Sequence, residues 1–189
     1  GADTRTVKLA ALVVAHEGAE IPELRANGRD VIAPTKLATL FGRSYWRFDF
    51  ELPKSRAAGY SFGSETYEVC TDLGDDLRIG FVSCNGQEDG DLDRPLEDRR
   101  ERMATGFSDV MRDAVLKFYL DHYLAIYGQP QISHMLARVP SLMMWDDHDI
   151  FDGWGSHKKW FQGTAVARGM FACAREAFCL MQLGCAPDE

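Results

Sequence analysis

The stretch from residue 139 to residue 157 limits the fold more than any other part of the chain, because an apolar run leads directly into a cluster of ionisable side chains. An apolar run such as 139–145 (VPSLMMW), bounded by polar residues and glycine, is typical of a buried strand. Four carboxylates and two imidazoles follow within the twelve residues 146–157. We therefore expect a buried strand over 139–145 that brings this cluster to the carboxyl edge of a sheet, where open α/β sheets bind ligands.

The ionisable cluster predicts a metal ligand beside a proton donor. Asp146, Asp147 and Asp149 surround His148, and crowded like charges repel one another unless a cation or hydrogen-bond donors offset them. The neighbouring carboxylates also favour the protonated imidazole and so keep it a competent general acid. An alternative stays open, in which the cluster is a charged loop and a neighbouring carboxylate satisfies His148. His157 is a candidate for supporting the site or contacting substrate, although an exposed loop histidine explains it as well.

Spacing excludes a calcium loop of the EF-hand type. Such a loop needs three alternating acidic positions followed at once by glycine. Counting from Asp147, the third acidic position is occupied by Phe151, and Gly153 comes one residue late, after Asp152. A transition-metal or mixed site stays open, because carboxylate, imidazole and thiolate ligands suit iron, manganese or zinc.

Composition excludes two classes of partner. The chain has 189 residues and a net charge of −8, which argues against a general binder of nucleic acid or of anionic membranes. Phosphate substrates are not excluded, because a bound metal supplies positive charge locally. No apolar run approaches the ~20 residues that span a bilayer, so we expect no membrane contact.

The cysteines indicate a reducing compartment. The five are odd in number and form no C-x-x-C pair, which fits reduced thiols better than a disulfide framework or a structural zinc site. The N-terminus shows neither the apolar region of a signal peptide nor an initiator methionine. We therefore expect a cytoplasmic location, and a chain that was processed or cut from a longer one.

Residues 1–75 predict a small β-sandwich-like domain. The strand-like segments are 7–14, 45–52 and 66–71. Apolar and polar residues alternate cleanly in the second of them, and Pro53 follows it, as expected for a half-buried antiparallel strand. Asn27-Gly28 is a hairpin-type turn signal.

Residues 76–189 predict an α/β layered domain that alternates strand, helix, strand and helix. A strand over 77–82 leads into residues 85–102, which show no clear period and indicate a loop or disorder. Apolar residues recur at helical spacing over 107–126 and 165–183. The signals at the helix ends are Ser108 or Thr105 before the first helix, Gly128 and Pro130 after it, and Gly184 after the second.

A short motif at residues 59–63 raises the question of a serine hydrolase. Gly59-x-Ser61-x-Gly63 matches the nucleophile elbow, with Asp and His residues later in the chain. The elbow needs a buried strand before the serine and a helix after it, whereas an alternating strand follows here. We therefore expect a glycine-rich hairpin loop, and a serine hydrolase at Ser61 is the least favoured function.

The ionisable cluster also carries a family resemblance. Residues 144–156 (MWDDHDIFDGWGS) resemble the signature of alkaline phosphatase D-like (PhoD-like) metallophosphatases, within the calcineurin-like metallophosphoesterase superfamily. Ser83-Cys84-Asn85 resembles the first metal-binding loop of that family, and the segments 107–126 and 136–141 match its approach to the signature. The resemblance covers roughly residues 77–184, and the N-terminal β region resembles the extra sandwich domain of the family.

The resemblance implies hydrolysis of phosphate mono- or diesters at a dinuclear metal centre. It makes Asp147 a metal ligand and His148 the group that contacts the phosphate and donates a proton. Cys84 would bind a ferric ion as thiolate, or be a buried small residue at a strand end. Asp146, Asp149 and His157 would support the site or contact substrate. The implied metals are iron, calcium, manganese or zinc, and the implied partner is a small phosphate ester.

The chain also departs from the family pattern. Nothing matches the motif whose aspartate bridges the two metals, and residues 98–102 stand where its strand would begin. The histidine motifs that close the site are absent before Glu189. We therefore expect residues missing near 98–102 and after 189, and little phosphate-ester turnover from these 189 residues alone. A non-catalytic fragment or binding module of the same fold is the alternative.

Overall fold

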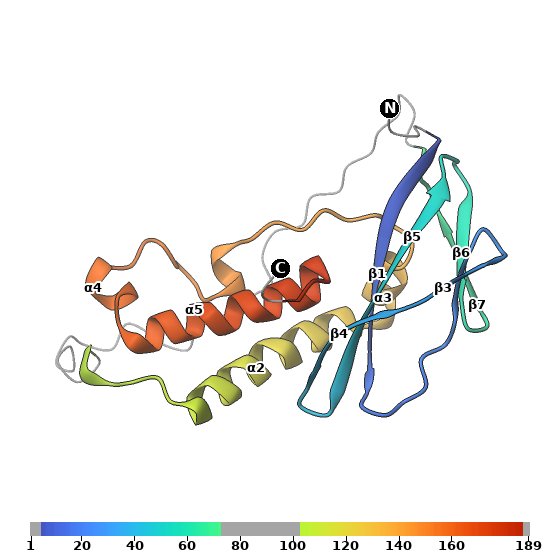
Figure 1. Ribbon diagram of the computed structural model, residues 1–189. Coiled ribbons are helices and arrows are strands. Elements are labelled where there is room, and N and C mark those ends of the chain that lie inside the picture. Colours follow the sequence, from blue (N-terminus) through green and yellow to red (C-terminus); the bar gives the residue numbers. More distant parts are fainter. Residues whose placement is uncertain (1–4, 73–102, 187–189) are drawn as a thin grey trace. The chain divides into compact units, whose positions relative to one another are not determined.

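The computed structural model describes residues 5–72 and 103–186 (Figure 1). The chain divides into two compact units, each described here by itself. The first unit contains the N-terminal strands together with residues 126–142 and 184–186. The second contains residues 103–125 and 143–183. Within these described ranges, no helix combines the length and the apolar character that crossing a membrane requires.

The first unit contains two antiparallel sheets. One sheet has the strand order β1 (Thr6–His16), β5 (Arg43–Pro53), β4 (Thr35–Leu40). The other has the order β3 (Asp30–Ile32), β2 (Leu24–Ala26), β6 (Ala58–Phe62), β7 (Glu65–Val69). The strands predicted over 7–14, 45–52 and 66–71 are confirmed as β1, β5 and β7, with small shifts at their ends.

The inward faces of the two sheets share one core. Along β5, Phe48, Phe50 and Leu52 are buried while the residues between them are exposed, as the alternation predicted. The Phe48 and Phe62 ring centroids lie 5.9 Å apart, and those of Phe50 and Tyr60 lie 5.2 Å apart. Each of these pairs joins one sheet to the other, so the apolar face of β5 holds the unit together.

The turn between β2 and β3 is the one that the sequence predicted. Asn27 has φ 53° and Gly28 has φ 73°, the left-handed region that matches the twist of a tight hairpin. The amide of Arg29 donates to the carbonyl oxygen of Ala26 at 3.2 Å and closes the turn.

Tyr60 gives this core a measurable dependence on pH. Its hydroxyl donates to the carbonyl oxygen of Ala137 at 2.8 Å. Burial and the neighbouring Tyr67 raise the pKa of Tyr60 to about 12, although Arg138 acts to lower it. In the unfolded chain the same phenol ionises near its ordinary pKa of 10.0. Stability contributed by the neutral phenol is therefore complete below pH 10 and falls as the pH rises towards the folded pKa.

We expect the wild-type β unit to lose up to about 2–3 kcal/mol of unfolding free energy through Tyr60 as the pH rises from 10 to 12. Tyr60→Phe should start less stable, because the hydrogen bond to Ala137 is gone, but should show a flatter pH profile. Urea unfolding of both proteins across this range measures the two slopes. Parallel slopes would contradict the shifted pKa.

The described part of the chain after residue 102 is helical. The helices are α2 (Asp109–Tyr127), α3 (Pro130–Leu136), α4 (Lys159–Gln162) and α5 (Ala165–Phe178), with a 3-10 turn η2 (Asp147–Asp149) and a π-helical turn η3 (Cys179–Leu183). The two predicted helices are confirmed as α2 and as α5 with η3. Ser108 accepts from the amide of Met111 at 3.3 Å, and Gly184 follows η3 with φ 59°.

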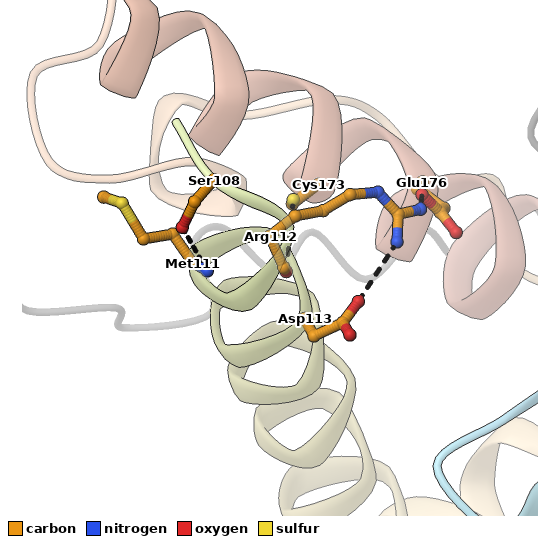
Figure 2. Close-up of polar contacts among 6 residues, drawn as sticks. All are labelled: Ser108, Met111, Arg112, Asp113, Cys173 and Glu176. Carbon is orange, nitrogen blue, oxygen red and sulfur yellow. Dashed lines mark hydrogen bonds and ion pairs between the residues drawn. The ribbon is translucent and has the colours of Figure 1, made fainter. Parts of the chain in front are cut away.

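Helices α2 and α5 pack on each other in the second unit. The residues of α2 that are buried are Leu116, Tyr119, Leu120 and Tyr123. Figure 2 shows the contacts near the start of α2, where Arg112 donates to Glu176 at 2.7 Å and the Cys173 thiol donates to the Arg112 carbonyl oxygen at 3.7 Å. Cys173 is buried, and this burial raises the pKa of its thiol.

The predicted buried strand over 139–145 is wrong. Residues 140–146 form no regular secondary structure, and Leu142 is fully exposed while Met144 is 74% exposed. No described strand lies beside this run to take up its backbone hydrogen bonds, and Pro140 lacks an amide proton. An apolar composition alone therefore does not produce a strand here.

The predicted α/β layered domain is consequently not confirmed. The described structure consists of antiparallel sheets followed by helices, and it does not establish a metallophosphoesterase fold. The predicted strand over 77–82, the loop over 85–102, the domain boundary near 75 and the missing segment near 98–102 all lie outside the described residues. Those parts stay predictions.

Candidate metal centre

The ionisable cluster begins with a reciprocal cap on the short turn η2. The carboxylate of Asp146 accepts from the amide of His148 at 3.1 Å, and the amide of Asp146 donates to Asp149 Oδ2 at 2.9 Å. This arrangement is a capping box, in which two otherwise unpaired amides are satisfied by side chains. The turn therefore fixes the backbone on both sides of Asp147 and His148.

Two tyrosines of α2 hold the same turn from the other side. Asp149 is 3% exposed, and its Oδ1 accepts from the Tyr123 hydroxyl at 2.5 Å. The Tyr119 hydroxyl donates to the carbonyl oxygen of Ile150 at 2.5 Å. Asp149 is thus buried and hydrogen bonded within the turn, and its predicted supporting role stays a prediction.

Asp147, His148 and Asp152 bring three metal-binding atoms together, all within 4.8 Å of one another. His148 Nε2 lies 2.8 Å from Asp152 Oδ1. Asp147 Oδ2 accepts from the amide of Gly153 at 2.9 Å, and Gly153 has φ 70°, which favours glycine. The chain therefore turns back on itself after η2 and brings both carboxylates close to the imidazole.

The surroundings of Asp147 keep its carboxylate ionised. Burial acts to raise its pKa, but the Gly153 amide, the Asp146 side chain and the charge of His148 together hold that pKa below its ordinary value of 3.8. A carboxylate must be deprotonated to bind a cation. Asp147 meets this requirement throughout the neutral range.

The three donors fit a metal ion by their chemistry. Two carboxylates and an imidazole suit manganese, iron or zinc, and three protein ligands leave positions open for water or substrate. The group is partly exposed, and such acidic groups also occur without an ion. Cys84, the further ligand predicted from the sequence, lies outside the described residues, so its place relative to this group stays a prediction.

Sequence reasoning counted Asp152 in the cluster but did not name it as a donor. Asp152 lies beyond the end of η2, so no helical spacing in the sequence signalled its approach to His148. His157 lies next to Asp152, with Nε2 3.0 Å from the Asp152 carbonyl oxygen. Its ring also packs against Phe151 and Phe161, at centroid distances of 5.4 and 5.3 Å.

The sheet geometry excludes a nucleophile elbow at Ser61. Ser61 lies inside β6, where it pairs with Arg25 of β2 and Thr66 of β7. Gly63 follows in the turn to β7 with φ 58°, and no helix begins there. The expectation of a hairpin is confirmed, and Ser61 does not lie in a nucleophile elbow.

Comparison with known proteins agrees with the resemblance seen in the sequence. The family model described as PhoD related phosphatase matches residues 95–188, a range that contains all three donors. Residues 95–188 are therefore similar to PhoD-related phosphatases.

An uncharacterized protein of Saccharomyces cerevisiae is 32% identical over 82 residues, which cover 36% of this chain and 12% of the yeast protein. The chain thus corresponds to a small part of the curated relative that it matches. No solved structure matches this chain.

Proposed function

We propose that this protein hydrolyses phosphate mono- or diesters with the help of bound metal, and that residues 146–157 form part of its active site. The observation that carries the proposal is the grouping of Asp147, His148 and Asp152 within 4.8 Å. The similarity of residues 95–188 to a phosphatase family supports the same chemistry.

Each of the three side chains has a role that its contacts suggest. Asp147 offers an ionised carboxylate to the metal. His148 donates a proton to the leaving-group oxygen of the ester from the ring nitrogen that does not face Asp152. Asp152 accepts from the His148 ring, which orients it and favours its protonated form. A bound metal would polarise the phosphoryl oxygens and supply a hydroxide near neutral pH; Cys84 is proposed as a further ligand, and iron, calcium, manganese and zinc are the candidate ions.

A binding module without catalysis is the second candidate. The described group offers three candidate metal ligands. A dinuclear centre also needs a ligand that bridges the two metals. A chain of this kind would bind a cation or a phosphate without turnover. Metal binding and hydrolysis must therefore be measured separately.

The test is Mn²⁺ binding followed by electron paramagnetic resonance, on wild type and on Asp147→Asn. We expect the substitution to weaken Mn²⁺ binding by at least about tenfold, because a neutral amide replaces an anionic ligand. Asp121→Asn is the matched control, since it removes the same charge from an ion pair with Lys117 on α2. Equal affinity of wild type and Asp147→Asn would contradict the proposed site.

Hydrolysis is measured with p-nitrophenyl phosphate and bis-p-nitrophenyl phosphate, on the 189-residue chain and on the protein as its gene encodes it. We expect little turnover from the 189-residue chain alone. The protein as its gene encodes it should show metal-dependent turnover that Asp147→Asn removes. Mn²⁺ binding without turnover in both preparations would favour the binding module instead.

A further inference from the structure

We propose that Tyr123 and Gln182 are positioning residues, which act through Asp149 to hold Asp147 and His148 in place. The inference rests on the proposed function, because the placement of these donors matters only if they act on a metal or a phosphate. Neither residue belongs to the signature: Tyr123 lies on α2 and Gln182 on η3.

The three side chains form a closed set of hydrogen bonds. Asp149 Oδ1 accepts from the Tyr123 hydroxyl at 2.5 Å and from Gln182 Nε2 at 2.8 Å. Gln182 Nε2 also lies 3.0 Å from the Tyr123 oxygen and donates to it. Two separate elements therefore fix the same carboxylate oxygen, which limits rotation of the Asp149 side chain.

The other carboxylate oxygen of Asp149 extends this constraint to Asp147 and His148. Asp149 Oδ2 accepts from the amide of Asp146 at 2.9 Å, and Asp147 and His148 are the two residues between these partners. If Asp149 rotated, the first amide of the turn would lose its acceptor. The carboxylate of Asp147 and the ring of His148 would then be free to move away from Asp152.

Stability alone does not explain a carboxylate at this place. A buried carboxylate is costly even when it is hydrogen bonded, and an apolar side chain of similar volume often stabilises a protein as well or better. The carboxylate provides a rigid bridge between a functional turn and two packed elements instead. Functional side chains need support of this kind to stay within about 0.5 Å of their working geometry. Gln182 also lies in a π-helical turn, a feature frequent at functional sites.

The test compares Mn²⁺ affinity in wild type, Tyr123→Phe, Gln182→Met and the double variant. Tyr123→Phe removes one hydroxyl and leaves the ring, so it is the least disruptive change. We expect each single variant to weaken Mn²⁺ binding by about 10-fold or more, the usual range for groups that orient a ligand being about 10- to 100-fold. Because both residues act through one oxygen, the double variant should be hardly weaker than the worse single variant. Additive losses, or affinities equal to wild type, would overturn the proposal.

Cys173→Ala is the matched control for a purely structural effect. Cys173 is buried between α2 and α5, so its truncation lowers the stability of the same unit without touching the turn. The control should melt at a lower temperature yet bind Mn²⁺ as wild type does. Weakened Mn²⁺ binding in the control, to the same extent as in Tyr123→Phe, would mean that stability alone sets the affinity and would overturn the proposal.

A second readout needs no metal. The amide of Gly153 donates to Asp147 Oδ2, so its hydrogen exchange reports where the Asp147 carboxylate lies. In metal-free protein, Tyr123→Phe should exchange this amide at least about tenfold faster, while Cys173→Ala should not. If the wild type bound no Mn²⁺, the proposed function would be contradicted. The exchange rates would still test whether Tyr123 holds the Asp147 carboxylate in place. Unchanged exchange in Tyr123→Phe would overturn it.

Discussion

His148→Asn is expected to lower kcat for phosphate-ester hydrolysis by about 10²- to 10⁴-fold, the usual contribution of a general acid. His148 Nε2 lies 2.8 Å from Asp152 Oδ1, and an adjacent carboxylate favours the protonated ring. Asparagine keeps a polar side chain there but has no proton to transfer near neutral pH. Steady-state rates with p-nitrophenyl phosphate, in whichever preparation hydrolyses the ester, measure the loss.

His134→Asn provides the control for this change. His134 is an exposed histidine on α3, so the same substitution there should leave kcat unchanged. The Mn²⁺ affinity of His148→Asn separates two roles: a loss as large as that of Asp147→Asn would make His148 a ligand instead of an acid. A kcat equal to wild type would remove His148 from the reaction.

The ion pair between His148 and Asp152 contributes little to the unfolding free energy of the protein. The Asp152 side chain is 72% exposed and the His148 side chain 24%, and ion pairs this open to water contribute about 0–1 kcal/mol. A substitution of either residue should therefore leave the melting temperature almost unchanged. Loss of activity at an unchanged melting temperature would indicate a chemical role for the pair.

Local sequence patterns correctly predicted two kinds of element. Some pair with a segment nearby in the chain, and others have one buried face whose spacing can be recognised. The alternation from Trp46 to Leu52 gave β5, helical spacing gave α2 and α5, and Asn27-Gly28 gave the first hairpin. In each case the burial period of a single segment decides the structure. The signature at 144–156 similarly predicted the family that residues 95–188 match.

Long-range contacts set the limits of that reasoning. The run over 139–145 reads as a strand, but a strand exists only with a neighbour to pair with, and composition does not supply one. The burial of Asp149 depends on Tyr123 and Gln182, which are 26 and 33 residues away. Contacts over such long sequence separations produce no recognisable local pattern. From the sequence alone, Asp149 was therefore one more member of an acidic cluster.

Phe151, two residues after the turn η2, anchors the signature in the second unit. Phe151 is 2% exposed, and its ring packs edge-on against Trp154 at a centroid distance of 5.1 Å. It also contacts His157 and Phe161. Trp154 in turn stacks on Phe171 of α5 at 5.5 Å. Phe151 is therefore the point where the loop that carries Asp152 joins the helical core.

Phe151→Ala is expected to lower the unfolding free energy of this unit by about 3–5 kcal/mol, the usual cost of emptying a buried phenylalanine site. The indole of Trp154 would also lose its edge-on partner, so the loop should loosen together with the core. Urea unfolding followed by circular dichroism at the helical minimum measures the change. Phe118→Ala is the matched control: Phe118 is 59% exposed on α2, so its loss should cost no more than about 0.5–1 kcal/mol. Equal costs at the two positions would show that Phe151 does not anchor the loop.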